Sequence, residues 1–464
     1  MSGLLGWNTI LTFTNSYNCD VFMNHVWVGS GWAFWSALAY SISLNIFSGA
    51  LSSRTIADWF TVGFRCFFGC MLGASGVLAL LVIRFEWEGK NPAEDDTFKL
   101  GVALLCVFCL ACGSAFWQSA TFGMAGAIHP SLMQAMMLGQ GIAGVVSGAV
   151  GFVAGSSPIA LACSFIFASA LLLGNIAFYF YLSTRNPHLK RFAELPKHAG
   201  SSVQQQQQQQ QQSRDGSRPS PDSGSPPLST NIEEGAAHPA ASSPSTPDSS
   251  DLPTRRSSVR ILRKSAWPQA ITVCSVLGAT FVVFPGVISQ WSPAEGWEKD
   301  NVNYLVATFQ LMDVIGRAAP QVERLQISNG RVVSLLAFLR CVIFIPSFML
   351  MQRYKVRNEL LQFAMMTLFA FTNGYVSTLS MILGPSQRTV QDDEKQPVGT
   401  LMSFFLCFGI FAGSLLALPT QIGWHPPPSN CDTLPGNNGD SLLSTASGAL
   451  SQLLLAGASQ LWGS

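Results

Sequence analysis

Apolar residues gather along the chain into long runs of membrane-spanning length. An α-helix rises 1.5 Å per residue, so about 20 apolar residues cross the hydrocarbon core of a bilayer. The apolar runs predict eleven spans, near 3–18, 26–51, 60–84, 100–126, 130–154, 157–183, 267–290, 302–320, 332–352, 359–383 and 398–421. Backbone polar groups must be satisfied within the segment in lipid, and the period-two alternation of a membrane barrel is absent. We therefore expect an all-α membrane protein.

A polar segment separates the first six runs from the last five. It holds nine consecutive glutamines from Gln204, followed by Ser/Pro-rich sequence. Such a composition cannot bury enough apolar surface to order itself, so the segment is expected to be a disordered linker. The predicted layout is an N-terminal bundle of six spans at 1–185, the linker at 186–265, a C-terminal bundle of five spans at 266–422 and a tail at 423–464. Two bundles around a midplane cleft are typical of transporters.

Basic residues flank the linker on both sides. Four follow the sixth span and five precede the seventh, at Arg185, Lys190, Arg191, Lys197, Arg255, Arg256, Arg260, Arg263 and Lys264. Basic clusters beside spanning helices stay in the cytoplasm. The linker and the N-terminus are therefore expected inside and the C-terminus outside, with the basic loop 352–359 as the one loop that disagrees. The plasma membrane is the expected location.

Composition supports the membrane assignment and narrows the function. Charged residues make up 11% of the 464, against about 25% in soluble domains, and hydrophobic residues make up 48%. The net charge of +1 gives no argument for a nucleic-acid partner. The N-terminus "MSGLLGWNTI" lacks the basic region of a signal peptide, so insertion would rely on the first spans.

Catalytic and metal-binding patterns are missing. The histidines lie in loops or tails, and neither a G-x-S-x-G motif nor a P-loop is present. The spacing of three cysteines, Cys106, Cys109 and Cys112, resembles that of metal ligands. Because no His or carboxylate lies in the same stretch, we interpret them as small buried residues of a helix. A disulfide between Cys19 and Cys431 is the one cysteine pairing considered. No enzyme activity, cofactor, metal or obligatory protein partner is expected.

Ionisable residues inside a spanning run are costly and therefore point to function. Asp313 and Arg317 in "QLMDVIGRAAP" are four residues apart, so their side chains lie on one helix face. The pair must face the bundle interior or a wet cavity. It is either a structural ion pair or a site for a polar ligand, with Asp313 held ionised.

Neutral polar residues extend this set. Gln118 in the fourth span has two donors and an acceptor, which suits the edge of a purine or pyrimidine, and interhelical contact is the alternative. Trp7 and Asn8 in the first span place a ring beside an amide. Trp7 is either an interfacial anchor or a stacking platform. Asn373 and the ionisable Arg340 complete the set of polar residues inside the spanning runs.

The stretch "GQGIAG" at 139–144 has the glycine spacing of a dinucleotide-binding turn. That turn needs a preceding strand, whereas this stretch lies inside a spanning apolar run. Small residues spaced in this way let two membrane helices approach closely. We therefore expect Gly139, Gly141, Gly144 and Gly148 to form a packing face.

Seven motifs together resemble the equilibrative nucleoside transporter family. They are "WN" at 7–8, "QSATFGMAGAIHPS" at 118–131, "GQGIAG" at 139–144, "DVIGR" at 313–317, "LRCVIFIPSF" at 339–348, "FAFTNGYVSTLSMILGP" at 369–385 and "GTLMSFFLCFGIFAGS" at 399–414. The polyglutamine linker looks more like a protozoan member, such as an apicomplexan adenosine transporter. The resemblance implies eleven helices of major-facilitator type that move nucleosides by alternating access.

The resemblance also implies roles for individual residues. Gln118 would bind the nucleobase, Trp7 and Asn8 would line the same cavity, and Asp313 and Arg317 would meet the ribose hydroxyls. Ser114 matches a position that influences inhibitor fit, and Arg340 and Asn373 match residues with structural or gating roles. The family motif is "LPWN", and Gly6 stands in the place of its proline in this chain. The first predicted span also starts at the motif, with almost no residues ahead of it. Either the first helix is short or translation begins upstream.

Three functions are weighed. The leading one is a facilitative carrier of nucleosides, adenosine-like and extending to nucleobases, with the nucleoside and membrane lipid as partners. The alternative is a proton-coupled carrier of nucleosides, nucleobases or another polar solute, with Asp313 as the titrating group. The third is a membrane sensor that signals through the linker.

Overall fold

The protein is described from a computed structural model of the whole chain. The structure describes residues 2–13, 17, 21–22, 32–87, 96–154, 157–185, 266–284, 287–288, 291 and 301–422. The predicted linker at 186–265, the tail at 423–464, Cys19 and Cys431 lie outside the described residues. The described helices all belong to one compact unit.

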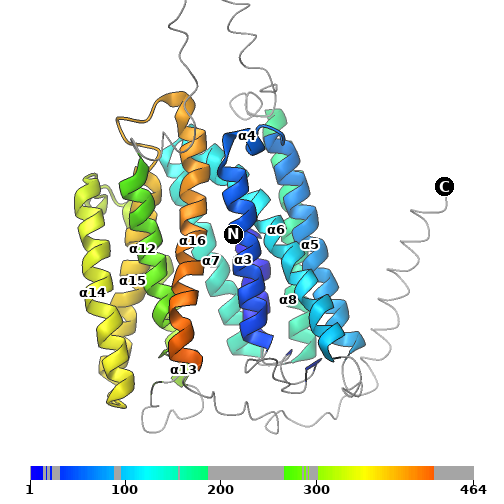
Figure 1. Cartoon of the computed structure of the whole chain (residues 1–464), viewed down its shortest axis with the longest axis vertical. Helices are drawn as coiled ribbons and strands as arrows, with labels where there is room; N and C mark the ends of the chain where they lie inside the picture. Colours follow the sequence, from blue (N-terminus) through cyan, green and yellow to red (C-terminus); the bar gives the residue numbers. More distant parts are fainter. Residues whose placement is uncertain are drawn as a thin grey trace, which may run out of the picture. The chain divides into compact units, whose positions relative to one another are not determined.

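Helices make up the regular structure of the described residues, and these residues contain no strand. The longer helices are α1 (Ser2–Thr12), α3 (Trp32–Ser52), α5 (Val62–Glu86), α6 (Asp96–Ile128), α7 (Pro130–Ala154), α8 (Pro158–Arg185), α12 (Trp267–Val283), α13 (Asn301–Ala318), α14 (Gly330–Arg353), α15 (Glu359–Leu383) and α16 (Lys395–Ile422), shown in Figure 1. The short ones are α4 (Arg54–Ala57) and the 3₁₀ turns η4 (Ala319–Gln321), η5 (Glu323–Leu325) and η6 (Asp392–Glu394). The all-α prediction is confirmed.

Each predicted span overlaps one of the longer helices. Among the described residues, seven of these helices are long and apolar enough to cross a membrane: α5, α6, α7, α8, α14, α15 and α16. Helix α12 is apolar but has only 17 residues. The count of eleven crossings therefore stays a prediction.

Local sequence explains where several helices begin. The side chain of Thr61 accepts a hydrogen bond from Phe64 N at the start of α5, and Asn358 accepts one from Leu361 N at the start of α15. Such caps satisfy N–H groups that the first turn leaves without helical partners. Helices α7 and α8 each begin with a proline, which lacks that N–H.

Helices from the two ends of the chain pack against each other. Helix α16 contacts α12, α3 and α6, and it lies between α12 and α3 in Figure 1. Helix α13 contacts α15 and α7. These two junctions bring residues from the first and second halves of the sequence together.

Among the described glycines, the closest approach to the backbone of another helix is between α13 and α15. A Cβ added to Gly374 would lie 2.0 Å from the carbonyl oxygen of Asp313, and one added to Gly316 would lie 2.2 Å from that of Phe371. No side chain fits at such distances, so glycine is required for this packing. The contact places α15 directly against the polar face of α13.

Candidate functional site

The predicted Asp313–Arg317 pair is formed and buried. Arg317 Nε donates to Asp313 Oδ2 at 2.6 Å, one turn apart on α13. The two residues are only 6% and 8% exposed. A buried ion pair is retained only where further hydrogen bonds satisfy its remaining atoms, so its surroundings are informative.

Arg317 connects α13 to α7. Its Nη1 donates to the backbone carbonyl oxygen of Met137 at 3.2 Å. Gly141 lies beside it on α7, and a Cβ there would come within 2.9 Å of Arg317 Cδ. The arginine thus bridges two helices that lie far apart in the sequence.

Asn373 connects the pair to α15 and α12. Its Nδ2 donates to Asp313 Oδ1 at 2.7 Å, and its Oδ1 accepts from the Thr280 hydroxyl at 2.6 Å. Both oxygens of Asp313 therefore accept hydrogen bonds from N–H groups. The Asn373 amide has one orientation in this network, because reversing it would set its oxygen against the carboxylate.

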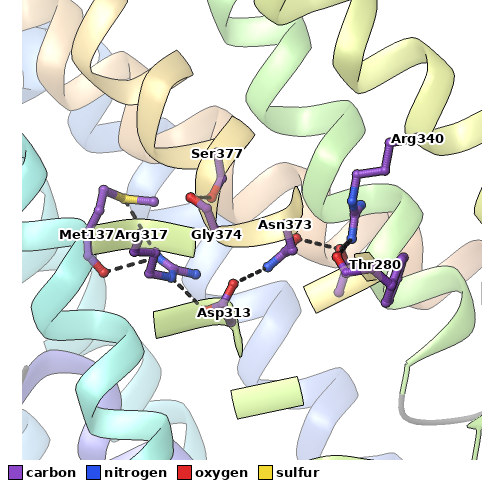
Figure 2. A network of polar contacts seen from close by, with 9 residues as sticks. Met137, Thr280, Asp313, Arg317, Arg340, Asn373, Gly374 and Ser377 are labelled. Atoms are coloured by element: carbon purple, nitrogen blue, oxygen red, sulfur yellow. Dashed lines mark hydrogen bonds and ion pairs between the residues drawn. The ribbon is translucent and has the colours of Figure 1, made fainter. Parts of the chain in front are cut away.

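Arg340 completes the network from α14 and is 2% exposed. Its Nη2 donates to Thr280 Oγ1 at 2.9 Å, and its Nη1 donates to the carbonyl oxygen of Val276 at 2.7 Å. Its guanidinium carbon lies 4.2 Å from the centre of the Phe369 ring, which is cation–π geometry. Figure 2 shows the series of contacts from Met137 through Asp313 and Thr280 to Arg340.

Gln118 lies in a second buried group, where α6 meets α16 and α3. Its Oε1 accepts from the Cys407 thiol of α16 at 3.7 Å, while its Nε2 is buried without a hydrogen-bond partner. Ser114, one turn earlier on α6, is also buried. Trp7 stacks on Tyr40 with ring centres 4.1 Å apart. Gln118 thus contacts α16 through Cys407, and Trp7 contacts α3 through Tyr40.

Asn8 lies at the junction of α1 and α7 instead. Its Nδ2 is 3.9 Å from the position of a Cβ on Gly144, and the Gln310 side chain of α13 is 3.8 Å from the same position. At Gly148 a Cβ would collide with the Gln310 amide. Gly141, Gly144 and Gly148 thus face α13, and Gly144 also faces α1; Gly139 is half-buried on the same helix.

The contacts described place the predicted residues in two groups. Asp313, Arg317, Asn373 and Arg340 share one network. Ser114 and Gln118 lie one turn apart on α6 and form the second group, while Trp7 of α1 stacks on Tyr40 of α3. Sequence reasoning missed Thr280, since an isolated threonine in an apolar run carries no signal until its partners on α14 and α15 are known.

The chemistry available is hydrogen bonding and stacking. Amide, guanidinium and carboxylate groups are buried near aromatic rings, an inventory that suits an uncharged polar ligand. Within the described part of the chain, no group of three or more His, Cys, Asp or Glu side chains could hold a metal ion. Cys106, Cys109 and Cys112 lie along α6 as free thiols.

The sequence of the chain is similar to those of known nucleoside transporters, which fits a site for an uncharged polar ligand. A model of the nucleoside transporter family matches residues 104–422, more than half of the chain. Adenosine transporter 1 of Crithidia fasciculata is 25% identical over 385 residues, which cover 75% of this chain and 76% of that protein. Equilibrative nucleoside transporter 2 of Homo sapiens is 28% identical over 361 residues, covering 74% and 75%.

Among solved structures, the major-facilitator proton:xylose symporter XylE is similar to this chain with a TM-score of 0.48 and 12% identity, covering 89% of this chain and 85% of that one. The apolar helices and the family match make the chain a multi-pass integral membrane protein. This chain belongs to the nucleoside transporter family.

Proposed function

We propose that the protein carries nucleosides, adenosine among them, across the membrane by facilitated diffusion, with its ligand held between the two groups of buried polar residues. The chain belongs to a transporter family and is not an enzyme. The observation that carries the proposal is the buried Asp313–Arg317 pair, which joins α13 to α7 and so links the two halves of the sequence. Ligand contact there can be coupled to relative motion of the halves.

The polar groups match the parts of a nucleoside. Asp313 and Arg317 offer an acceptor and donors for ribose hydroxyls, and Gln118 has a free N–H group for the base. Trp7 and Tyr40 offer ring faces nearby. Asn8 lies beside Gly144 on the α13-facing side of α7, which supports a role for it in ligand binding.

Facilitated transport is favoured over proton coupling at Asp313. Both of its oxygens accept hydrogen bonds from N–H groups in this structure, so the carboxylate serves as an acceptor. Proton carriage would need the same group to act as a donor during the cycle. Uptake should therefore persist when the pH gradient is collapsed, and loss of uptake would favour the proton-coupled alternative.

The site is tested by labelled adenosine uptake in a transport-null cell. Asp313→Ala and Gln118→Ala should each abolish most of the uptake per molecule of protein at the cell surface. Wild-type uptake rates in both variants would refute the site assignment. A competition panel of nucleosides, free bases and sugars in the same cells ranks the substrates.

The plasma membrane is the proposed location, with the N-terminus and the 186–265 linker in the cytoplasm and the C-terminus outside. The basic residues that flank the linker support this orientation. Epitope tags placed in the linker and at the C-terminus test it. The C-terminal tag should be stained in intact cells, and staining of the linker tag without permeabilisation would contradict the orientation.

A further inference from the structure

Two buried polar atoms without a hydrogen-bond partner belong to side chains that both contact Cys407. They are Gln118 Nε2 on α6 and Asn45 Oδ1 on α3. Asn45 Nδ2 donates to the Cys407 carbonyl oxygen at 3.2 Å, and the Cys407 thiol donates to Gln118 Oε1 at 3.7 Å. One residue of α16 therefore holds both amides, and the two unpaired atoms belong to one place in the fold.

The Asn45 amide has a definite orientation. Its Nδ2 also donates to the carbonyl oxygen of Ser41 at 2.8 Å, so the nitrogen contacts two carbonyl oxygens. Reversing the amide would place its oxygen against both of them, which is repulsive. Oδ1 is therefore the free acceptor.

The free atoms are complementary in kind. Gln118 is 3% exposed and leaves an N–H donor unpaired, while Asn45 leaves a buried acceptor unpaired. Buried polar groups are nearly always hydrogen-bonded, and an exception calls for an explanation. A planar ligand edge that has an acceptor beside an N–H donor would satisfy both atoms at once.

Helix α3 also carries an aromatic ring that is stacked on a second one. Tyr40 lies on α3, the helix that carries Asn45, and Trp7 of α1 stacks on it with ring centres 4.1 Å apart. Flat heteroaromatic ligands combine stacking with hydrogen bonds along an edge. The junction of α3, α6 and α16 thus has the chemistry of a nucleobase subsite.

We propose that Asn45 is a second base-recognition residue, whose Oδ1 accepts an N–H of the nucleobase while Gln118 Nε2 donates to an acceptor on the same edge. This proposal rests on the nucleoside transport proposed above. It defines the substrates as nucleosides whose base presents an N–H donor beside an acceptor. Purine riboside, whose base has no N–H, is the matched ligand that lacks the donor.

The ligand arm of the test uses the wild-type chain in transport-null cells. Adenosine and purine riboside compete with labelled adenosine, and the ratio of their inhibition constants is measured. One neutral hydrogen bond predicts that adenosine competes about 2- to 12-fold better. Equal competition by the two nucleosides would overturn the proposal, and this measurement requires no variant to fold.

The protein arm compares Asn45→Leu and Asn45→Ala with Asn175→Leu. Asn175 on α8 is a matched control, because its Nδ2 likewise donates to a carbonyl oxygen one turn earlier, at 2.7 Å. Both Asn45 variants should bring the ratio close to one, whereas Asn175→Leu should keep the wild-type ratio. A merely structural role for Asn45 would lower transport of both nucleosides equally and leave the ratio unchanged, which would overturn the proposal.

The two proposals fail in different ways. If wild-type protein at the surface takes up no adenosine, nucleoside transport itself is contradicted. If the wild-type protein takes up adenosine but the Asn45 variants keep the wild-type ratio of inhibition constants, nucleoside transport is supported and the role of Asn45 in base recognition is contradicted.

Discussion

Replacing Gly374 by alanine should separate α13 from α15 and break the polar network. The added methyl group would lie 2.0 Å from the Asp313 carbonyl oxygen and 2.8 Å from Arg317 N. Carbon and oxygen atoms approach to about 3.3 Å, so the helices must move apart by about 1.3 Å. Both nearby atoms are backbone, so no side-chain rotation can relieve the contact.

The separation has a calculable effect on the Asn373–Asp313 hydrogen bond. This bond is 2.7 Å long, and a shift of about 1.3 Å would stretch it to about 4.0 Å, beyond hydrogen-bonding range. Overpacking costs about 1–3 kcal/mol and a lost hydrogen bond to a charged group about 1.5–3 kcal/mol. The expected loss, about 2.5–6 kcal/mol, is a large fraction of a typical folding free energy.

Thermal denaturation of the purified full chain in detergent, together with adenosine uptake in cells, measures this effect. Gly174→Ala on α8 is the matched control, because a Cβ there would meet nothing within 4 Å. Gly374→Ala should lower the denaturation temperature and the uptake rate, whereas Gly174→Ala should change neither. Equal stability and uptake for the two variants would refute the packing argument.

Substitutions at Thr280, Gly144 and Arg340 test neighbouring parts of the fold. Thr280→Val should lower the free energy of unfolding by about 1–3 kcal/mol, because it removes a hydroxyl that is hydrogen-bonded to both Asn373 and Arg340. Thr308→Val should lower it less, because the Thr308 hydroxyl bonds only the carbonyl oxygen of Tyr304 in its own helix. Gly144→Ala should keep wild-type uptake because the nearest atoms are 3.8 Å from the added carbon, while Gly144→Leu should reduce uptake or surface expression. Arg340→Lys should destabilise the protein by about 2–4 kcal/mol, since an ammonium cannot reproduce the planar set of donors, and an unchanged denaturation temperature would contradict this role.

Much of the helical layout was predictable from the sequence. Apolar runs marked every longer helix, because a membrane span needs about 20 apolar residues and that length is visible without tertiary information. The Asp313–Arg317 pair was also predictable, since residues four apart on a helix are neighbours whatever surrounds them. Local geometry determines both features.

Contacts between distant helices were not predictable in the same way. The glycines predicted to form a packing face lie on α7, where Gly148 meets the side chain of Gln310. Among the described glycines, however, the closest approach to a neighbouring backbone is at Gly374 and Gly316, which stand isolated among larger residues in the sequence. Thr280 forms a bridge only because α14 and α15 place Arg340 and Asn373 within hydrogen-bonding distance of its hydroxyl. The roles of these residues depend on which helices pack against each other, and residue spacing in a single sequence does not reveal those contacts.

The most direct test of the central claim is uptake of labelled adenosine by proteoliposomes that contain the purified full chain. The account predicts saturable uptake down the concentration gradient with no pH gradient imposed, and loss of most of that uptake in Asp313→Ala reconstituted in equal amount. Uptake no greater than in protein-free liposomes, or a wild-type rate in Asp313→Ala, would contradict it.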